Sequence, residues 1–194
     1  MPLPVLAGLA EARACTLCAE HLPLGPRPVL AGTPTSRIVI VGQAPGTKVH
    51  ASGVPWDDDS GRRLREWLQI DDEVFYDPAR VALLPMGFCY PGRKGGGDAP
   101  PRPECAPTWH ERLMAGMPEL RLVVLAGMYA HKHYLGRSRR KTLTETVRVG
   151  EEYGPRLFPL PHPAWRVRLW MKKNPWFEAE TLPRLRAAVS DALA

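Results

Sequence analysis

The chain has 194 residues and a mass of 21.6 kDa, enough for one domain with its own hydrophobic core. With 44% apolar and 24% charged residues, its composition is that of a globular protein and excludes a disordered one. The longest apolar runs, such as 81–84 and 122–127, are far shorter than the roughly 20 residues of a membrane span. The N-terminus lacks the basic start and apolar stretch of a signal peptide. We therefore expect a single domain over 1–194 that is cytoplasmic, monomeric and not bound to a membrane.

The net charge of +6 is unevenly distributed along the chain. Residues 121–173 contain twelve Lys and Arg against three Glu, so this segment carries +9 and the rest of the chain −3. A one-sided basic surface is typical of proteins that bind a polyanion such as DNA. A basic face that is merely solvated is the alternative.

Taken in chain order, short apolar runs alternate with helical patterns. The sequence predicts helices at 6–19, 60–68, 107–117, 129–135 and 177–193, and strands at 37–42, 80–84, 121–127 and 156–160. The strand runs are rich in Val, Ile and Leu without polar alternation, as in a parallel sheet covered on both faces. We therefore predict an α/β fold with three layers, α/β/α, around a central four-stranded parallel sheet. Residues 92–103, rich in Gly and Pro, are predicted to form a polar loop.

Gly- and Pro-rich segments follow each predicted strand. They occupy residues 42–46, 85–89, 127–129 and 161–164. Open parallel sheets bind ligands outside the carboxyl ends of their strands. We expect these four segments to converge on one cleft.

The four cysteines form a pattern typical of a metal centre. Cys15 and Cys18 are the ends of a C-x-x-C motif, whereas Cys89 and Cys105 are separated by sixteen positions that include the Gly/Pro loop. Four thiolates hold either a zinc ion or an iron–sulfur cluster. The second pair is too widely spaced for a zinc knuckle, so the pattern favours a 4Fe–4S cluster, with zinc or unligated cysteines as the alternatives. Ligation would also hold both ends of the loop.

The segment after the first strand is a second candidate site. A Gly-rich turn at 42–46 is either only a tight turn or a cradle for phosphate, and it matches no nucleotide-binding fingerprint. Trp56, in the loop that follows, is either a core residue or a flat platform on which a base stacks.

Taken together, these motifs resemble a known family. C-x-x-C near the start, G-x-A-P-G after the first strand and G-x-P-aromatic ten residues on occur here in order. Two further Cys around a Pro-rich loop and a late His-Pro-Ala follow them. The set is similar to the iron–sulfur uracil-DNA glycosylases, the family 4 branch of the uracil-DNA glycosylase superfamily, from residue 15 to about 190.

The resemblance implies a role for each matching position. Cys15, Cys18, Cys89 and Cys105 would ligate a 4Fe–4S cluster, while Trp56 would stack on a flipped uracil. His162 would donate to a uracil carbonyl oxygen as negative charge develops on the base. Gly42, Ala44, Pro45 and Gly46 would shape the turn beneath the base. Residues 164–173, including Arg166 and Arg168, would form the loop that enters the DNA groove.

Two positions depart from the family pattern. Gln43 stands where the family has a carboxylate, and an amide can orient a water but cannot act as a base. The uracil-reading Asn of the family falls on Leu84 or Pro85, neither of which can read a pyrimidine edge with its side chain. Another carboxylate, from Asp57, Asp58 or Asp59, is the candidate replacement for the missing one.

From this resemblance we expect a monofunctional DNA glycosylase. It would flip uracil, or a related deaminated base, out of DNA and hydrolyse the N-glycosidic bond. The alternative is a non-catalytic iron–sulfur protein that binds nucleic acid on the same scaffold, with Gln43 and Pro85 as the marks of lost catalysis.

Overall fold

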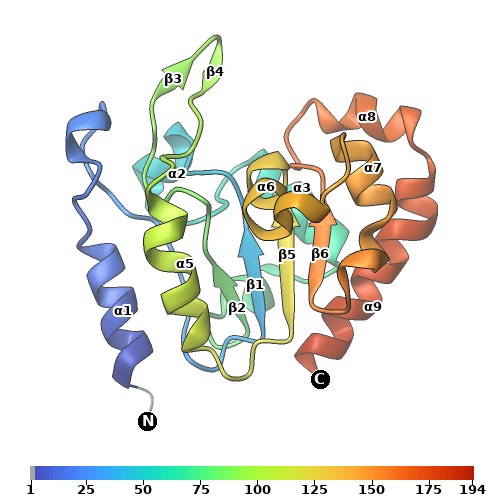
Figure 1. Cartoon of the computed structure of the whole chain (residues 1–194), viewed down its shortest axis with the longest axis horizontal. Helices are drawn as coiled ribbons and strands as arrows, with labels where there is room; N and C mark the ends of the chain where they lie inside the picture. The colour runs from blue at the N-terminus through green and yellow to red at the C-terminus, as the bar shows by residue number, and fades with distance from the viewer. Residues whose placement is uncertain (1–2) are drawn as a thin grey trace.

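The computed structural model describes residues 3–194, with side chains from Ala7 onward; residues 1 and 2 of the predicted domain lie outside the described part. Its centre is a sheet of four parallel strands in the order β2-β1-β5-β6 (Figure 1). The strands are β1 (Ile38–Val41), β2 (Val81–Leu83), β5 (Leu122–Ala126) and β6 (Leu157–Leu160). Each lies within the range predicted from its apolar run, so the predicted four-stranded parallel sheet is confirmed.

Helices cover both faces of this sheet. They are α1 (Leu3–Arg13), α2 (Thr47–Ser52), α3 (Asp59–Leu68), α4 (Asp72–Tyr76), α5 (Cys105–Ala115), α6 (Met128–Leu135), α7 (Leu143–Arg148), α8 (Val167–Lys173) and α9 (Leu182–Leu193). Alternate residues of β1 face opposite layers, as the two-residue period of a strand requires. Val39 and Val41 pack with α1, α5 and α6, whereas Ile38 and Ile40 pack with α3, α4 and α7 to α9. The predicted α/β/α layering is therefore confirmed.

The chain order of the strands locates the cleft. After β2 the chain crosses over β1 to form β5 on its other side, so the strand order reverses between β1 and β5. A crevice opens at the carboxyl ends of the strands where such a reversal occurs. The turn at 42–46 and the segment after β6 both lie at this edge.

Several segments differ from the sequence-based prediction, and α2, α4 and α7 were not predicted. The first helix ends at Arg13, so Cys15 and Cys18 lie in the loop before a short 3-10 helix, Ala19–His21, rather than in the helix. Residues 167–173, expected to be a loop, form α8 because Val167 and Trp170 pack against the second core layer. The last predicted helix starts with a π-helical turn, Phe177–Thr181, before α9.

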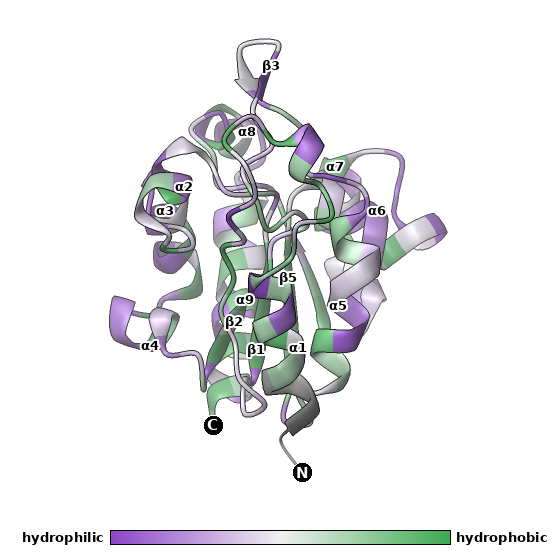
Figure 2. Cartoon of the chain, turned by 90° about the vertical axis from the view of Figure 1, so that its left-hand side faces the viewer, coloured by the Kyte–Doolittle hydropathy of each residue, from purple (hydrophilic) through white to green (hydrophobic). Residues whose placement is uncertain are grey.

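The polar loop at 92–103 contains a small hairpin. Its strands are β3 (Arg93–Lys94) and β4 (Gly97–Asp98), paired antiparallel. Gly95 and Gly96 form the two-residue turn with φ of 57° and 82°, the left-handed conformation that such tight hairpin turns require. The hairpin stands out from the body of the molecule in two perpendicular views (Figures 1 and 2).

Among the described helices, none is long and apolar enough to cross a membrane.

Candidate active site

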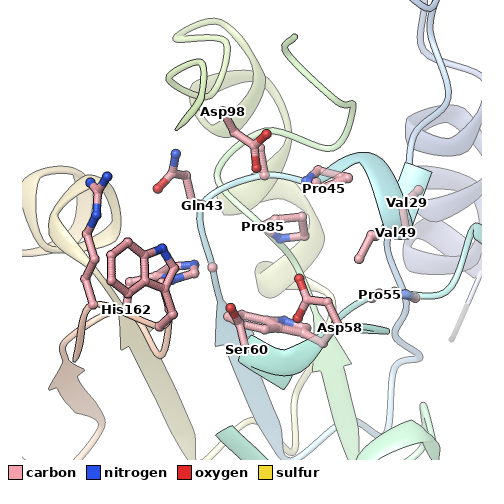
Figure 3. Close-up of a pocket in the computed structure, with 17 residues that line it drawn as sticks. Val29, Gln43, Pro45, Val49, Pro55, Asp58, Ser60, Pro85, Asp98 and His162 are labelled. Carbon is pink, nitrogen blue, oxygen red and sulfur yellow. The ribbon is translucent and has the colours of Figure 1, made fainter. Parts of the chain in front are cut away.

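A cavity of about 350 Å³ opens at the carboxyl ends of β1 and β6 (Figure 3). Five parts of the chain line it. They are Val29; the turn Gly42–Gly46 together with Val49; Pro55, Trp56, Asp58 and Ser60; Pro85 together with Asp98; and His162 together with Ala164–Arg166. Three of the four strand-end segments predicted to converge therefore contribute to it. The fourth lies behind, where a Cβ on Gly127 would be 3.1 Å from Cβ of His162. The volume suits a small planar ligand.

The floor of the cavity is formed by Gly42, Trp56 and His162. A Cβ on Gly42 would lie 2.5 Å from Cζ2 of Trp56, so the indole can occupy its place only because residue 42 has no side chain. The indole is 9% exposed and stacks on the His162 ring at a centroid distance of 5.7 Å and an angle of 24°. Trp56 itself has φ of 58°, a conformation that costs a non-Gly residue roughly 1–3 kcal/mol and recurs at functional sites.

His162 is held in place from two sides. The Trp56 ring lies against its face, and Nη1 of Arg63 donates to the carbonyl oxygen of the next residue, Pro163, at 2.6 Å. The surrounding protein lowers the pKa of His162 to about 4, because burial disfavours the charged ring, and Asp58 opposes this. His162 is therefore neutral at pH 7 and has one ring N–H to donate.

The turn at 42–46 is fastened to the loop after β2. The amides of Met86 and Gly87 donate to the carbonyl oxygens of Gly42 and Gln43, at 2.9 and 3.0 Å. The carbonyl oxygen of Pro85, one residue earlier, is bound by Nε2 of buried His110 at 3.0 Å. The backbone around the cavity is thus connected to α5.

Only one of the three candidate carboxylates lines the cavity. Asp58 does, and its Oδ1 accepts from the amide of Gly61 at 2.8 Å as the N-cap of α3. Asp57 and Asp59 are exposed and border a separate surface hollow, where Asp59 pairs with Arg62. Successive side chains at the beginning of a helix point in different directions. The three adjacent aspartates therefore do not all face the cavity.

A second carboxylate lines the cavity without having been predicted. Asp98, at the end of β4, lies with its Oδ2 3.3 Å from the position of a Cβ on Gly46. Desolvation by the surrounding protein raises its pKa, which Arg93 opposes and Asp58 reinforces. Nothing in the local sequence of the loop indicates that its tip reaches the end of β1.

The rim of the cavity consists of Asp98, Trp165 and Arg166. Trp165 is 69% exposed, and the guanidinium of Arg166 lies over its ring at 5.2 Å from the centroid. Arg168 is exposed on α8 and does not line the cavity. Leu169, one turn after Trp165, is also exposed, so an apolar ridge with basic neighbours borders the cavity.

The four cysteines gather around a second, smaller cavity beside α1 and α5. Cys15, Cys18, Cys89 and Cys105 all line it, and all four thiols are free. Burial raises the pKa of Cys105 to about 12, with smaller contributions from the other three thiols. The pKa values of Cys18 and Cys89 are also raised, first by burial and further by neighbouring cysteines. Every pair among the four is thus close enough to interact.

This cysteine cavity encloses about 20 Å³, and exposed Leu17 forms part of its wall. The amide of Phe88 donates to Sγ of Cys105 at 3.3 Å. Within residues 3–194 no group of three or more His, Cys, Asp or Glu side chains is placed to hold a metal ion as it stands. The four thiols nonetheless surround a common space.

The sequence was compared with models of known protein families, and one of them matches most of the chain. The family model described as the uracil DNA glycosylase superfamily matches residues 30–186, which include the whole sheet and every lining residue of the strand-end cavity except Val29.

Proposed function

This chain belongs to the uracil DNA glycosylase superfamily, which supports a DNA glycosylase function, and on that premise we propose that it excises uracil or a related deaminated base from DNA. The observation that carries the proposal is the cavity floor, where a neutral His162 stacks with Trp56 over Gly42. These are the parts that bond cleavage needs: a flat surface for a flipped base and a donor for the charge it acquires.

His162 supplies the donor. As the bond between C1′ and the base breaks, its electron pair leaves with the base, and negative charge spreads to the carbonyl oxygens. Burial disfavours the protonated ring, so His162 is neutral and keeps one N–H to donate. Because a neutral imidazole is a very weak acid, this N–H stabilises the charge as a hydrogen-bond donor and does not give up its proton. One preorganised donor of this kind is worth roughly 10²–10³ in rate.

DNA would lie across the rim. Trp165 is an exposed apolar side chain that lines the cavity, and Leu169 is exposed on the helix that follows, while Arg166 and Arg168 supply positive charge for phosphates. A base taken out of the stack leaves a gap that an apolar side chain can fill. Trp165, Arg166 and the +9 segment then serve DNA binding, and the floor stabilises the leaving base.

The cysteine cavity is proposed to hold a 4Fe–4S cluster, with Cys15, Cys18, Cys89 and Cys105 as ligands. The donor set fits, since four free thiols from three separate segments share one space and the Phe88 amide already donates to one sulfur. The sixteen positions that separate Cys89 from Cys105 are too many for a zinc knuckle, which favours a cluster over zinc. When bound, the cluster would supply four iron–thiolate bonds that tie the N-terminal loop to both ends of the hairpin loop.

The function is tested by incubating the purified chain with duplex oligonucleotides that carry uracil or hypoxanthine, followed by alkali. Strand scission after alkali alone, with free base released, is expected of a monofunctional glycosylase. DNA binding without release of any base would instead favour a non-catalytic DNA-binding protein. Gln43 and Pro85, the two departures from the family pattern, are the residues that point to this alternative.

The cluster is tested by anaerobic purification and metal analysis. We expect brown protein with about four irons per chain, and loss of iron in Cys89→Ser. Colourless protein with stoichiometric zinc would contradict the assignment and leave the glycosylase proposal standing.

A further inference from the structure

Gln43 leaves the cavity without a carboxylate at the position where the resemblance expects one, yet the hairpin brings another carboxylate, Asp98, into the lining of the same cavity. Figure 3 shows the side chains of Gln43 and Asp98 on the same side of the cavity, across from Asp58 and Ser60. We propose that Asp98 is a further catalytic residue, whose carboxylate accepts a proton from the water that attacks C1′ while the amide of Gln43 orients that water. This inference rests on the proposed function.

The chemistry balances with groups that the site contains. The water oxygen forms a bond to C1′, and the bond from C1′ to the base nitrogen breaks, its electron pair leaving with the base. Asp98 takes one proton of the water and later returns it to the released base anion or to solvent. No oxidant, reductant or metal is needed for this step.

Asp98 fits this role better than Asp58 does. The Oδ1 atom of Asp58 accepts from the Gly61 amide as a helix cap, which occupies this oxygen and fixes the orientation of the carboxylate. Asp98 lies on a hairpin outside any helix, with Oδ2 directed toward Gly46. A side chain at position 46 would press on this oxygen, so the glycine there leaves room for it.

The hairpin position is also suited to a group that acts only once DNA is bound. Asp98 is exposed in the free protein, and DNA lying across the rim would cover it and exclude bulk water. The loop that carries it starts at Cys89 and ends at Cys105, and it packs closely at its base, where a Cβ on Gly87 would lie 3.0 Å from Pro101. The reach of Asp98 into the cavity is thus set by anchored ends.

Several charges act on Asp98 and shape its pH dependence. Arg93 on the paired strand lowers its pKa and Asp58 across the cavity raises it, with desolvation as the largest effect and in the raising direction. Arg166 also lines the cavity, and His162 is neutral above about pH 4. The rate of base release should therefore rise with pH through a value above the ordinary pKa of an aspartate, as Asp98 ionises.

The test compares single-turnover base release and DNA affinity for wild-type protein, Asp98→Asn, Asp58→Asn and the double variant Gln43→Glu/Asp98→Asn. We expect Asp98→Asn to slow the chemical step roughly 10²–10⁴-fold, to remove the acid limb of the pH–rate profile and to leave affinity for DNA unchanged. Gln43→Glu in the same chain should restore much of the rate, because it supplies a carboxylate beside the same water. Gly97→Ala is the matched hairpin control, since its Cβ meets nothing within 4 Å.

The outcomes separate this proposal from the proposed function. An active wild-type protein whose Asp98→Asn variant is equally fast, or in which only Asp58→Asn is slow, overturns the role of Asp98 alone. A slow Asp98→Asn variant that Gln43→Glu does not rescue and that keeps the wild-type pH profile also overturns it, in favour of a structural role. A wild-type protein that releases no base overturns both.

Discussion

The floor and the rim of the strand-end cavity are built in different ways. The floor follows directly from β1 and β6 and is held by close contacts, with the Trp56 indole against Gly42 and the His162 ring against the indole. The rim is carried by an exposed hairpin and an exposed helix, and Trp165 keeps 69% of its surface accessible. The floor can therefore present fixed groups to a base, whereas the rim can adapt to a DNA backbone of any sequence.

The largest effect should come from removing the donor in the floor. His162→Ala should slow base release roughly 10²–10³-fold, because it removes the N–H proposed to donate to the leaving base. Duplex affinity should hardly change, since phosphate contacts dominate it. Single-turnover rates and titrations of the same duplex measure both, with His133→Ala, an exposed residue of α6, as the control. Equal losses of rate and affinity would show that His162 belongs to the binding surface instead.

A buried residue behind the floor should make stability sensitive to acid. His110 is neutral because burial lowers its pKa to about 4; its Nε2–H donates to Pro85, so Nδ1 accepts from the Tyr134 hydroxyl. The unfolded chain binds a proton near pH 6.5 and the folded chain does not, so stability is lost as pH falls from about 6.5 to 4. This residue alone contributes roughly 3 kcal/mol to that loss.

Urea unfolding across this pH range checks the expectation, with His110→Gln as the comparison. The variant should be less stable at pH 7 yet show a flatter acid dependence, while His162 contributes in the same direction to both chains. Parallel curves for the two chains would contradict it.

The close packing of the floor can be broken with one methyl group. Gly42→Ala should displace Trp56, because its Cβ would lie 2.5 Å from the indole. The expected loss in capture of the flipped base is about 1–3 kcal/mol, the range for one base–aromatic contact. Binding of uracil-containing and undamaged duplexes, compared side by side, measures it. Gly150→Ala, with an ordinary 3.4 Å contact to Pro159, should leave the difference intact.

The smallest effect is expected at the rim. Arg168→Ala should weaken binding to all duplexes alike, by a few-fold, and reduce the salt dependence by about one phosphate contact. The rate of base release from bound DNA should stay unchanged. Salt titrations with and without uracil test this, and Arg112→Ala, on α5 and paired with Glu11, serves as the control. A loss confined to uracil-containing DNA would instead place Arg168 in base recognition.

Local sequence predicted which strand ends meet at the cavity, and the resemblance singled out Trp56 and His162, but neither indicated Asp98, for a physical reason. The strands, the turn at 42–46 and the position of His162 depend on apolar runs and on residues next to them in the chain, so a pattern of a few residues suffices. Asp98 reaches the cavity only because its loop forms a glycine hairpin and because Pro101, in the same loop, packs against Gly87. The second contact joins residues that are far apart in the chain. The local sequence also could not predict which of the three adjacent aspartates faces the cavity, because this depends on Asp58 being the N-cap of α3.

The walls of the two cavities come from different stretches of the chain, which has a consequence for the order of assembly. Every wall residue of the cysteine cavity lies between Cys15 and Trp109, whereas the strand-end cavity needs residues as late as Arg166. Because synthesis proceeds from the N-terminus and domains begin to fold during it, all four cysteines are synthesised before β5 and β6. A growing chain therefore possesses its complete set of cysteines before it possesses the histidine proposed to act on the base.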